Sequence, residues 1–243
     1  MKRALTKGGA FKEGFGMDFL MVMRELLAGF GNTLLLFVVT LVLSLPLGLL
    51  ISAGSRFKIK PLKCLVKGFV WIIRSTPLML QILAVSLVPR YVFGALNKEL
   101  AAFFGVSVKM LMFIFVATAF VINYACYFSE IFRGATEAVP AGQREAGKVL
   151  GMTKGQIFRH IVIFQVFRKV LAPLSNETMS LVKDTALASV LGVVDLYTAA
   201  SGLVNNYVVL TPLLYAAIFY LAFNGLLTVL FGIAERKTAF YRE

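Results

Sequence analysis

A chain of 243 residues with 59% hydrophobic and only 15% charged residues is too apolar for an ordinary soluble domain. Its mean hydropathy is +0.83, and residues 33–53 carry no charge, whereas a soluble helix would place polar residues every few positions. The net charge of +13 does not indicate nucleic-acid binding, because Lys and Arg stand in short clusters between apolar runs. We therefore expect an integral membrane protein.

Histidine and cysteine usage predicts neither a metal centre nor a disulfide framework. His160 is the single histidine, which excludes multi-histidine metal sites. Cys64 and Cys126 have no zinc-like or disulfide-like spacing and lie beside or inside apolar segments. We expect both to be buried as small hydrophobic residues.

Five segments have the length and apolarity needed to cross a bilayer, so the sequence predicts an all-α membrane protein. The fourth is the least obvious, because it carries polar residues that lipid would not tolerate. An amino-terminal arm over 1–29, with an interfacial helix near 17–27, precedes the spans, and a cytoplasmic tail over 237–243 follows them. The expected spans are about 30–53, 66–88, 110–132, 170–194 and 212–234.

Basic residues near span ends predict the topology, since they are retained on the cytoplasmic side. Lys and Arg cluster between the first and second spans and between the third and fourth, so both loops should be cytoplasmic. The segment 195–211 has no Lys or Arg, while Arg236 and Lys237 follow the last span. The amino terminus is then outside and the carboxyl terminus is in the cytoplasm, although Lys2 and Arg3 in the amino-terminal arm favour the opposite arrangement.

The polar residues of the fourth span share one face. In a helix they fall within an arc of about 120°, and each charge near the bilayer centre costs on the order of 3 kcal/mol, so this face should line a pathway instead of facing lipid. Charges of both signs suit a zwitterionic solute. Alternatively, Lys183 and Asp184 satisfy each other or groups on neighbouring helices as structural contacts, without meeting a solute. The residues are Asn176, Glu177, Ser180, Lys183 and Asp184.

A polar insertion interrupts the second span. Arg74-Ser75-Thr76-Pro77 is followed by Gln81, and the proline should kink the helix and free backbone carbonyls. Arg74, Thr76 and Gln81 are therefore further candidates for the pathway. Arg74 could instead anchor the helix near the cytoplasmic boundary by extending its charge towards water.

The loop over 137–165 is long and amphipathic, which is typical of a segment that binds a partner. Small residues allow close backbone approach, and charged neighbours can fix the orientation of a docked helix. The expected docking residues are Arg144, Glu145, Ala146, Gly147 and Gly151.

This loop resembles the EAA loop of ABC importer permeases, with Glu145-Ala146-Gly147 followed by Gly151 and Ile161. Gly147 stands where a second alanine is usual. Other segments look like the polar amino-acid branch of that superfamily, which includes histidine and glutamine transporters. They are Arg74–Leu78, Phe128–Gly134, Val139–Gln143, Leu150–Met152, Asn176–Glu177 and Lys183–Ser189.

The resemblance implies a MetI-like permease domain over 30–236 with five transmembrane helices and a cytoplasmic coupling helix at about Glu145–Gly155. It implies a prokaryotic inner-membrane transport subunit for a polar amino acid, not an enzyme. The implied partners are two ATP-binding subunits, a second permease, either identical or paralogous, and an extracytoplasmic solute-binding protein.

The chain itself contains no phosphate-binding Gly-x-x-x-x-Gly-Lys-Ser/Thr loop, so ATP and Mg²⁺ should bind the partner ATPase and no cofactor should bind this chain. Three alternatives stay open. An opine or small peptide could replace the amino acid, an ATP-independent secondary transporter or channel could share the spans, and a membrane subunit that transports nothing would use the fourth-span charges only structurally.

Overall fold

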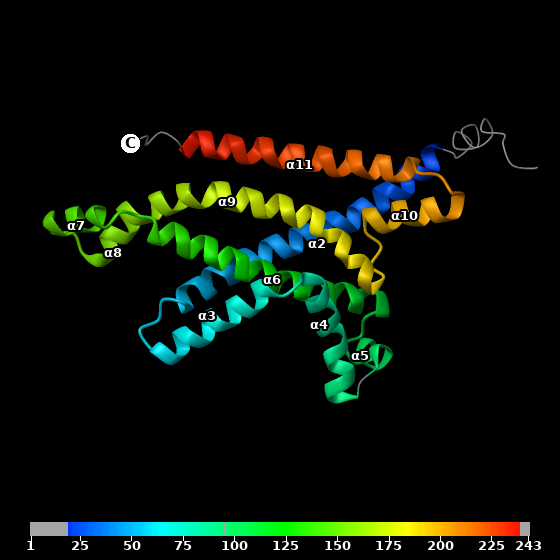
Figure 1. Cartoon of the computed structure of the whole chain (residues 1–243), viewed down its shortest axis with the longest axis horizontal. Helices are drawn as coiled ribbons and strands as arrows, with labels where there is room; N and C mark the ends of the chain where they lie inside the picture. Colours follow the sequence, from blue (N-terminus) through cyan, green and yellow to red (C-terminus); the bar gives the residue numbers. More distant parts are fainter. Residues whose placement is uncertain (1–18, 95, 239–243) are drawn as a thin grey trace, which may run out of the picture.

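The computed structural model describes residues 19–94 and 96–238, and in this part of the chain every regular element is helical. The helices form an elongated bundle from which α3 and α4 diverge (Figure 1). The elements are α2 (Phe19–Gly54), α3 (Lys60–Ser75), α4 (Leu78–Phe93), α5 (Asn97–Phe103), α6 (Val108–Glu137), α7 (Ala141–Val149), α8 (Lys154–Ile157), the π-helix η1 (Phe158–Val162), α9 (Ile163–Asp184), the 3₁₀ helix η2 (Thr185–Leu191), α10 (Leu196–Tyr207) and α11 (Thr211–Thr238).

Three of the described helices, α2, α6 and α11, are long and apolar enough to cross a membrane unbroken. Two further spans are bent helix pairs. α3 and α4 meet at an angle of 110°, and the helical stretch from Lys154 to Leu191 meets α10 at 58°. Counting each pair as one span gives up to five, which confirms the prediction of an all-α membrane protein.

Three details differ from the sequence prediction, and a fourth, the break in the second span, agrees with it. α2 runs unbroken from Phe19, so the described part of the expected interfacial segment 17–27 continues into the first span; residues 1–18 lie outside the described chain. The second span is divided at Thr76–Pro77, where the proline was expected to kink it. In the fourth, the α-helix ends at Asp184 and passes into η2. Cys64 is exposed instead of buried, whereas Cys126 is buried as expected.

The closest helix packing in the bundle joins α2 to α6. Small residues recur on α2 at every fourth position, and all of them are buried. A Cβ atom at Gly48 would lie 2.9 Å from the Cβ of Phe128 and 3.0 Å from the carbonyl oxygen of Ala125. Such small residues let two membrane helices approach closely. The residues on α2 are Thr40, Ser44, Gly48 and Ser52.

α10 is fixed to α2 through buried polar contacts. Asp195 is buried and caps α10 by accepting hydrogen bonds from the backbone N–H groups of Tyr197 and Thr198 at 3.1 and 3.0 Å. Thr33 on α2 accepts a bond from the backbone N–H of Leu196 at 3.0 Å. The connection that leads into α10, where the second pair bends, is therefore attached to α2.

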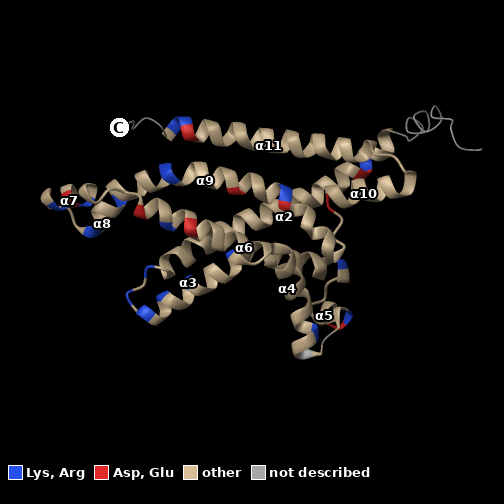
Figure 2. Ribbon diagram, viewed as in Figure 1, with Lys and Arg blue, Asp and Glu red and all other residues tan. Residues whose placement is uncertain are grey.

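One end of the molecule is basic. α7, α8, the start of α3 and the end of α11 all lie towards the left of Figure 1, and Figure 2 shows Lys and Arg positions on each of these elements. The bent centre of the α3–α4 pair lies further along α6, away from that end.

Candidate functional site

The α3–α4 bend is stabilised by side chains that replace lost helical hydrogen bonds. Pro77 has no N–H to donate, and Thr76 before it is extended, with φ −111° and ψ 143°. The Thr76 hydroxyl donates to the carbonyl oxygens of Ile72 and Ile73 at 3.0 and 3.3 Å. The side-chain amide of Gln81 donates to the Ile73 carbonyl at 2.7 Å and to Thr76 Oγ1 at 2.8 Å. Thr76 and Gln81 thus hold the bend.

The bend is also attached to α6. Asn123 Nδ2 donates to Gln81 Oε1 at 2.9 Å. The Arg74 guanidinium carbon lies 5.0 Å from the ring centroid of Tyr127, and Arg74 Nη1 is 3.6 Å from Glu130 Oε2. The three α6 residues are spaced i, i+4, i+7 and therefore share one face. The sequence left two roles open for Arg74, lining the pathway or anchoring the helix at the boundary. Its contacts place Arg74 at the bend and against α6.

Glu130 belongs to a chain of ion pairs that continues along α6 towards the basic end. Arg133 Nη2 is 2.6 Å from Glu130 Oε2, and Arg133 Nη1 is 2.6 Å from Glu137 Oε2. Two cations, Arg74 and Arg133, therefore share the Glu130 carboxylate. Charge-assisted contacts of this kind fix side-chain geometry more strongly than neutral ones.

α9 brings two of the predicted carboxylates to the same region. Asp184 Oδ2 accepts a hydrogen bond from the Tyr124 hydroxyl at 2.7 Å, so Asp184 is bonded to the neighbouring helix α6, a contact that the structural alternative had included. Glu177 is half-buried and lies within electrostatic range of Arg74 and Asp184. The bend of the second span and the polar face of the fourth therefore meet at α6.

Three of the predicted residues on the polar face of α9 have no partner within the described residues. Asn176 and Lys183 are exposed and Ser180 is half-buried, and no hydrogen bond or ion pair joins any of the three side chains to residues 19–94 or 96–238. A free ammonium and amide beside a carboxylate leave groups available to a solute or to a second subunit.

Residues on α6 that complete this site were not predicted as site residues. Asn123, Tyr124 and Tyr127 are polar or aromatic positions in a span whose neighbours are apolar, and Glu130 lies in a segment noted only for its resemblance. Polar groups at i, i+4, i+7 in a membrane helix were the available signal. Across the described residues, no group of three or more His, Cys, Asp or Glu side chains is arranged to hold a metal ion.

The docking segment is a short exposed helix at the basic end. α7 begins after Pro140 and ends near Gly151, whose φ of 72° is in the left-handed region. The expected coupling helix, Glu145–Gly155, is therefore shifted towards the amino terminus. Arg144 fastens α7 to α6, because its Nη2 donates to the Thr136 carbonyl at 3.2 Å.

Only part of the predicted docking set faces outward. Arg144, Glu145 and Ala146 are exposed, but Gly147 is buried, and a Cβ there would lie 2.8 Å from Ile157 Cγ1. Gly147 thus permits contact with α8 inside the chain and not with a partner. Val149 and Leu150, which were not predicted, are 87% and 78% exposed at the tip. An apolar tip on a charged helix is suited to binding another protein.

Membrane-spanning helices with a bent polar centre, joined to an exposed docking helix, define the membrane component of a transporter. Residues 44–240 match the family described as binding-protein-dependent transport system inner membrane component. The chain belongs to this family, so it is a transport subunit of the inner membrane and not an enzyme.

Relatives of known name agree with this assignment. The chain is 36% identical over 215 residues to the arginine ABC transporter permease protein ArtQ of Haemophilus influenzae, covering 86% of this chain and 90% of that protein. It is 32% identical over 211 residues to the L-cystine transport system permease protein TcyB of Bacillus subtilis, covering 86% and 84%.

Solved structures share the fold. The crystal structure of an amino acid ABC transporter with histidines matches with a TM-score of 0.75 and 28% identity, covering 91% of this chain and 99% of that one. An inward-facing structure of the MetNI methionine ABC transporter matches with a TM-score of 0.63 at 17% identity over the same shares, which shows the fold alone. The predicted family and MetI-like fold are confirmed.

The hydrogen bond between Gln81 and Asn123 can be tested by a double-mutant cycle. Gln81→Leu and Asn123→Leu should each lower the Tm of the purified protein by about 2–4 °C, because each removes bonds worth on the order of 1 kcal/mol. The double variant should lose less than the sum, since the two side chains share one bond. Gln143→Leu, at an exposed position on α7, should leave Tm unchanged. Additive losses would show that Gln81 and Asn123 do not interact.

Proposed function

We propose that this chain is the permease subunit of an ATP-driven importer for a polar amino acid. The observation that carries the proposal is the attachment of both bent polar segments and the docking helix to one helix, α6. The named relatives support an amino-acid solute, because they are described as permeases for arginine and for L-cystine.

The solute would contact the polar face of α9 and the bend of α3–α4. Lys183 is free to bind a carboxylate, and Glu177 can bind an ammonium. Asn176 and Ser180 add neutral polar groups, while Asp184 is held by Tyr124. Arg74, Thr76 and Gln81 would act chiefly by holding the bend beside this face. A zwitterion with a polar side chain matches this set of groups.

The partners would be two ATP-binding subunits, which bind ATP and Mg²⁺, a second permease and an extracytoplasmic solute-binding protein. The exposed α7 tip, with Val149 and Leu150, would sit in a groove of an ATPase subunit. The unpartnered groups on α9 support a second permease, identical or paralogous, because the pathway would then be closed by two copies of this face.

ATP binding would move α7, and α6 would carry that movement to the bend. Arg144 ties α7 to the end of α6, and the ion pairs from Glu137 to Arg74 follow the same helix. Two arrangements of the spans, one open inward and one open outward, would be biased by nucleotide.

In the membrane, the basic end of the molecule would face the cytoplasm, with the carboxyl terminus inside and the amino terminus outside. Support comes from the clustering of Lys and Arg on α7, α8, the start of α3 and the end of α11 (Figure 2).

Uptake by reconstituted vesicles tests the function. With the ATPase, the second permease and the binding protein present, labelled polar amino acids should enter only when ATP is supplied. Glu177→Gln should reduce uptake at least about tenfold, because one lost charge-assisted contact is worth roughly 1.5–3 kcal/mol; Glu235→Gln, exposed at the end of α11, should have no effect. Uptake driven by an ion gradient without ATPase would contradict the proposal, as would full uptake by a folded Glu177→Gln variant. Uptake of an opine or a peptide alone would overturn the amino-acid assignment.

Docking by α7 is tested separately. Leu150→Asp should abolish binding of the ATPase subunit to detergent-solubilised permease, because it places a charge in an apolar contact. The matched control is Val208→Asp, which adds the same charge at a residue that is 89% exposed beyond α10. Normal ATPase binding by Leu150→Asp, measured by co-purification, would show that α7 is not the docking element.

A further inference from the structure

α3 carries a basic stripe along one face. The stripe consists of Lys60, Lys63, Lys67 and Arg74, together with Trp71, and all five residues are exposed. On a helix these positions fall within an arc of about 80°. The opposite face is apolar, and Val70, the residue of α3 that is buried, lies at the edge of the stripe about 20° from Lys63.

The inner end of the basic stripe reaches the candidate pathway. Arg74 Nη1 lies 3.6 Å from Glu130 Oε2, and Arg74 is within electrostatic range of Glu177. Lys67 is in turn within electrostatic range of Glu130. The outer end, at Lys60, begins α3 at the basic end of the molecule (Figure 2). The stripe therefore runs from that end to the polar centre.

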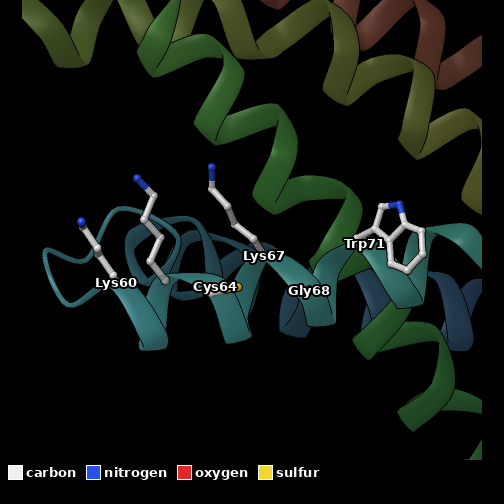
Figure 3. Close-up of a pocket in the computed structure, with 6 residues that line it drawn as sticks. Lys60, Cys64, Lys67, Gly68 and Trp71 are labelled. Atoms are coloured by element: carbon white, nitrogen blue, oxygen red, sulfur yellow. The ribbon is translucent and has the colours of Figure 1, made fainter.

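A hollow of about 470 Å³ lies along the outer half of the stripe, and Cys64 is among its lining residues. Figure 3 shows the side chains of Lys60 and Lys67 extending from α3 towards the side on which α6 passes. The hollow is shallow and open to the surroundings of the chain. Its lining residues are Lys60, Lys63, Cys64, Lys67, Gly68 and Trp71.

The positive charge of the stripe is not balanced locally. The sequence from 26 to 98 contains no Asp or Glu, and among the described residues none of the three lysines forms an ion pair. On α6, the Glu130 carboxylate is already paired with Arg133, whose Nη2 lies 2.6 Å from Glu130 Oε2. A row of free ammonium groups beside a pathway attracts anionic groups and raises their local concentration.

We propose that the basic stripe lines the cytoplasmic half of the solute pathway and binds the carboxylate of the solute as it leaves towards the cytoplasm. This inference rests on the proposed function. Lysine ammonium groups donate to carboxylates without fixed geometry, and successive lysines one helical turn apart offer a series of weak sites. Weak binding at several sites is what release requires, since a single tight site would retain the solute.

The same residues on a helix facing lipid would instead extend towards anionic headgroups. The two arrangements differ in what can reach Cys64. In a watery pathway, Cys64 meets dissolved ions under the field of the lysines; in lipid, it meets only reagents that partition into the membrane.

Thiol chemistry at Cys64 in the complete transporter distinguishes these arrangements. Cys126→Ser leaves Cys64 as the one cysteine of this chain, and vesicles are prepared with the cytoplasmic side outward. A sulfonate-bearing methanethiosulfonate should react with Cys64 faster than a trimethylammonium-bearing one. Lys63→Gln with Lys67→Gln should lower this anion-to-cation rate ratio about tenfold, because two positive charges near the thiol are lost. The matched control, Arg236→Gln with Lys237→Gln, removes two charges at the end of α11 and should leave the ratio unchanged.

Two results would overturn the inference. One is reaction with N-ethylmaleimide but with neither charged reagent, which would place Cys64 against lipid or a partner chain. The other is a wild-type ratio near one. ATP-driven uptake is measured in the same vesicles, so intact uptake with either result would reject the basic stripe and leave the permease function standing. A preserved anion preference without ATP-driven uptake would reject the proposed function instead.

Discussion

Polar groups held at membrane depth must find partners inside the protein, and in this chain α6 supplies most of them. Asn123 donates a hydrogen bond to Gln81 at the bend, Tyr124 donates one to Asp184 of α9, and Glu130 pairs with Arg74 at the end of α3. The small residues of α2 press against the opposite part of the same helix. The positions of α2, the α3–α4 pair and α9 are therefore set largely by one helix, whereas α11 packs on α9 and α10.

α3 shows how strongly this constraint acts. With Val70 as its buried residue, α3 gains little from apolar packing inside the chain, so its inner end is placed by the Arg74 contacts and by the hydrogen bonds of the bend. Each such bond contributes on the order of 1 kcal/mol, which is enough to fix a geometry yet small enough to allow two arrangements. A bent span held by a few polar contacts is suited to a transporter that alternates between states.

α6 also connects the polar centre of the molecule with α7 at its basic end. Its 30 residues extend about 45 Å, and its end is tied to α7 through Arg144 and Thr136. The polar centre and the predicted docking helix α7 are thus both attached to α6. Movement imposed on α7 by a partner would reach Arg74 and Gln81 through α6, to which α7 is joined by the short connection 138–140 and by the Arg144 hydrogen bond.

The sequence predicted the spans from apolar length and the bend from Pro77, because both follow from local chemistry. It also identified the polar face of α9, since charges in a membrane helix are rare. It did not show that Tyr124 is the partner of Asp184, or that Gly147 faces α8, because those contacts depend on which helix packs where. The early start of α2 and the shift of the docking helix depend on helix ends, which local pattern defines poorly. Tyr124 and Asn123 gave no signal beyond polarity until α4 and α9 were placed against them.

The most direct test of α6 as a single mechanical unit is the distance between spin labels at Val149 on α7 and Ser75 at the bend, in a chain whose two native cysteines are replaced. In the complete transporter, ATP should bring the α7 helices of the two permeases closer while the distance from Val149 to Ser75 within one chain stays unchanged. A change in that internal distance of more than about 5 Å, one helical turn, would show that α6 does not carry the movement of the docking helix to the pathway.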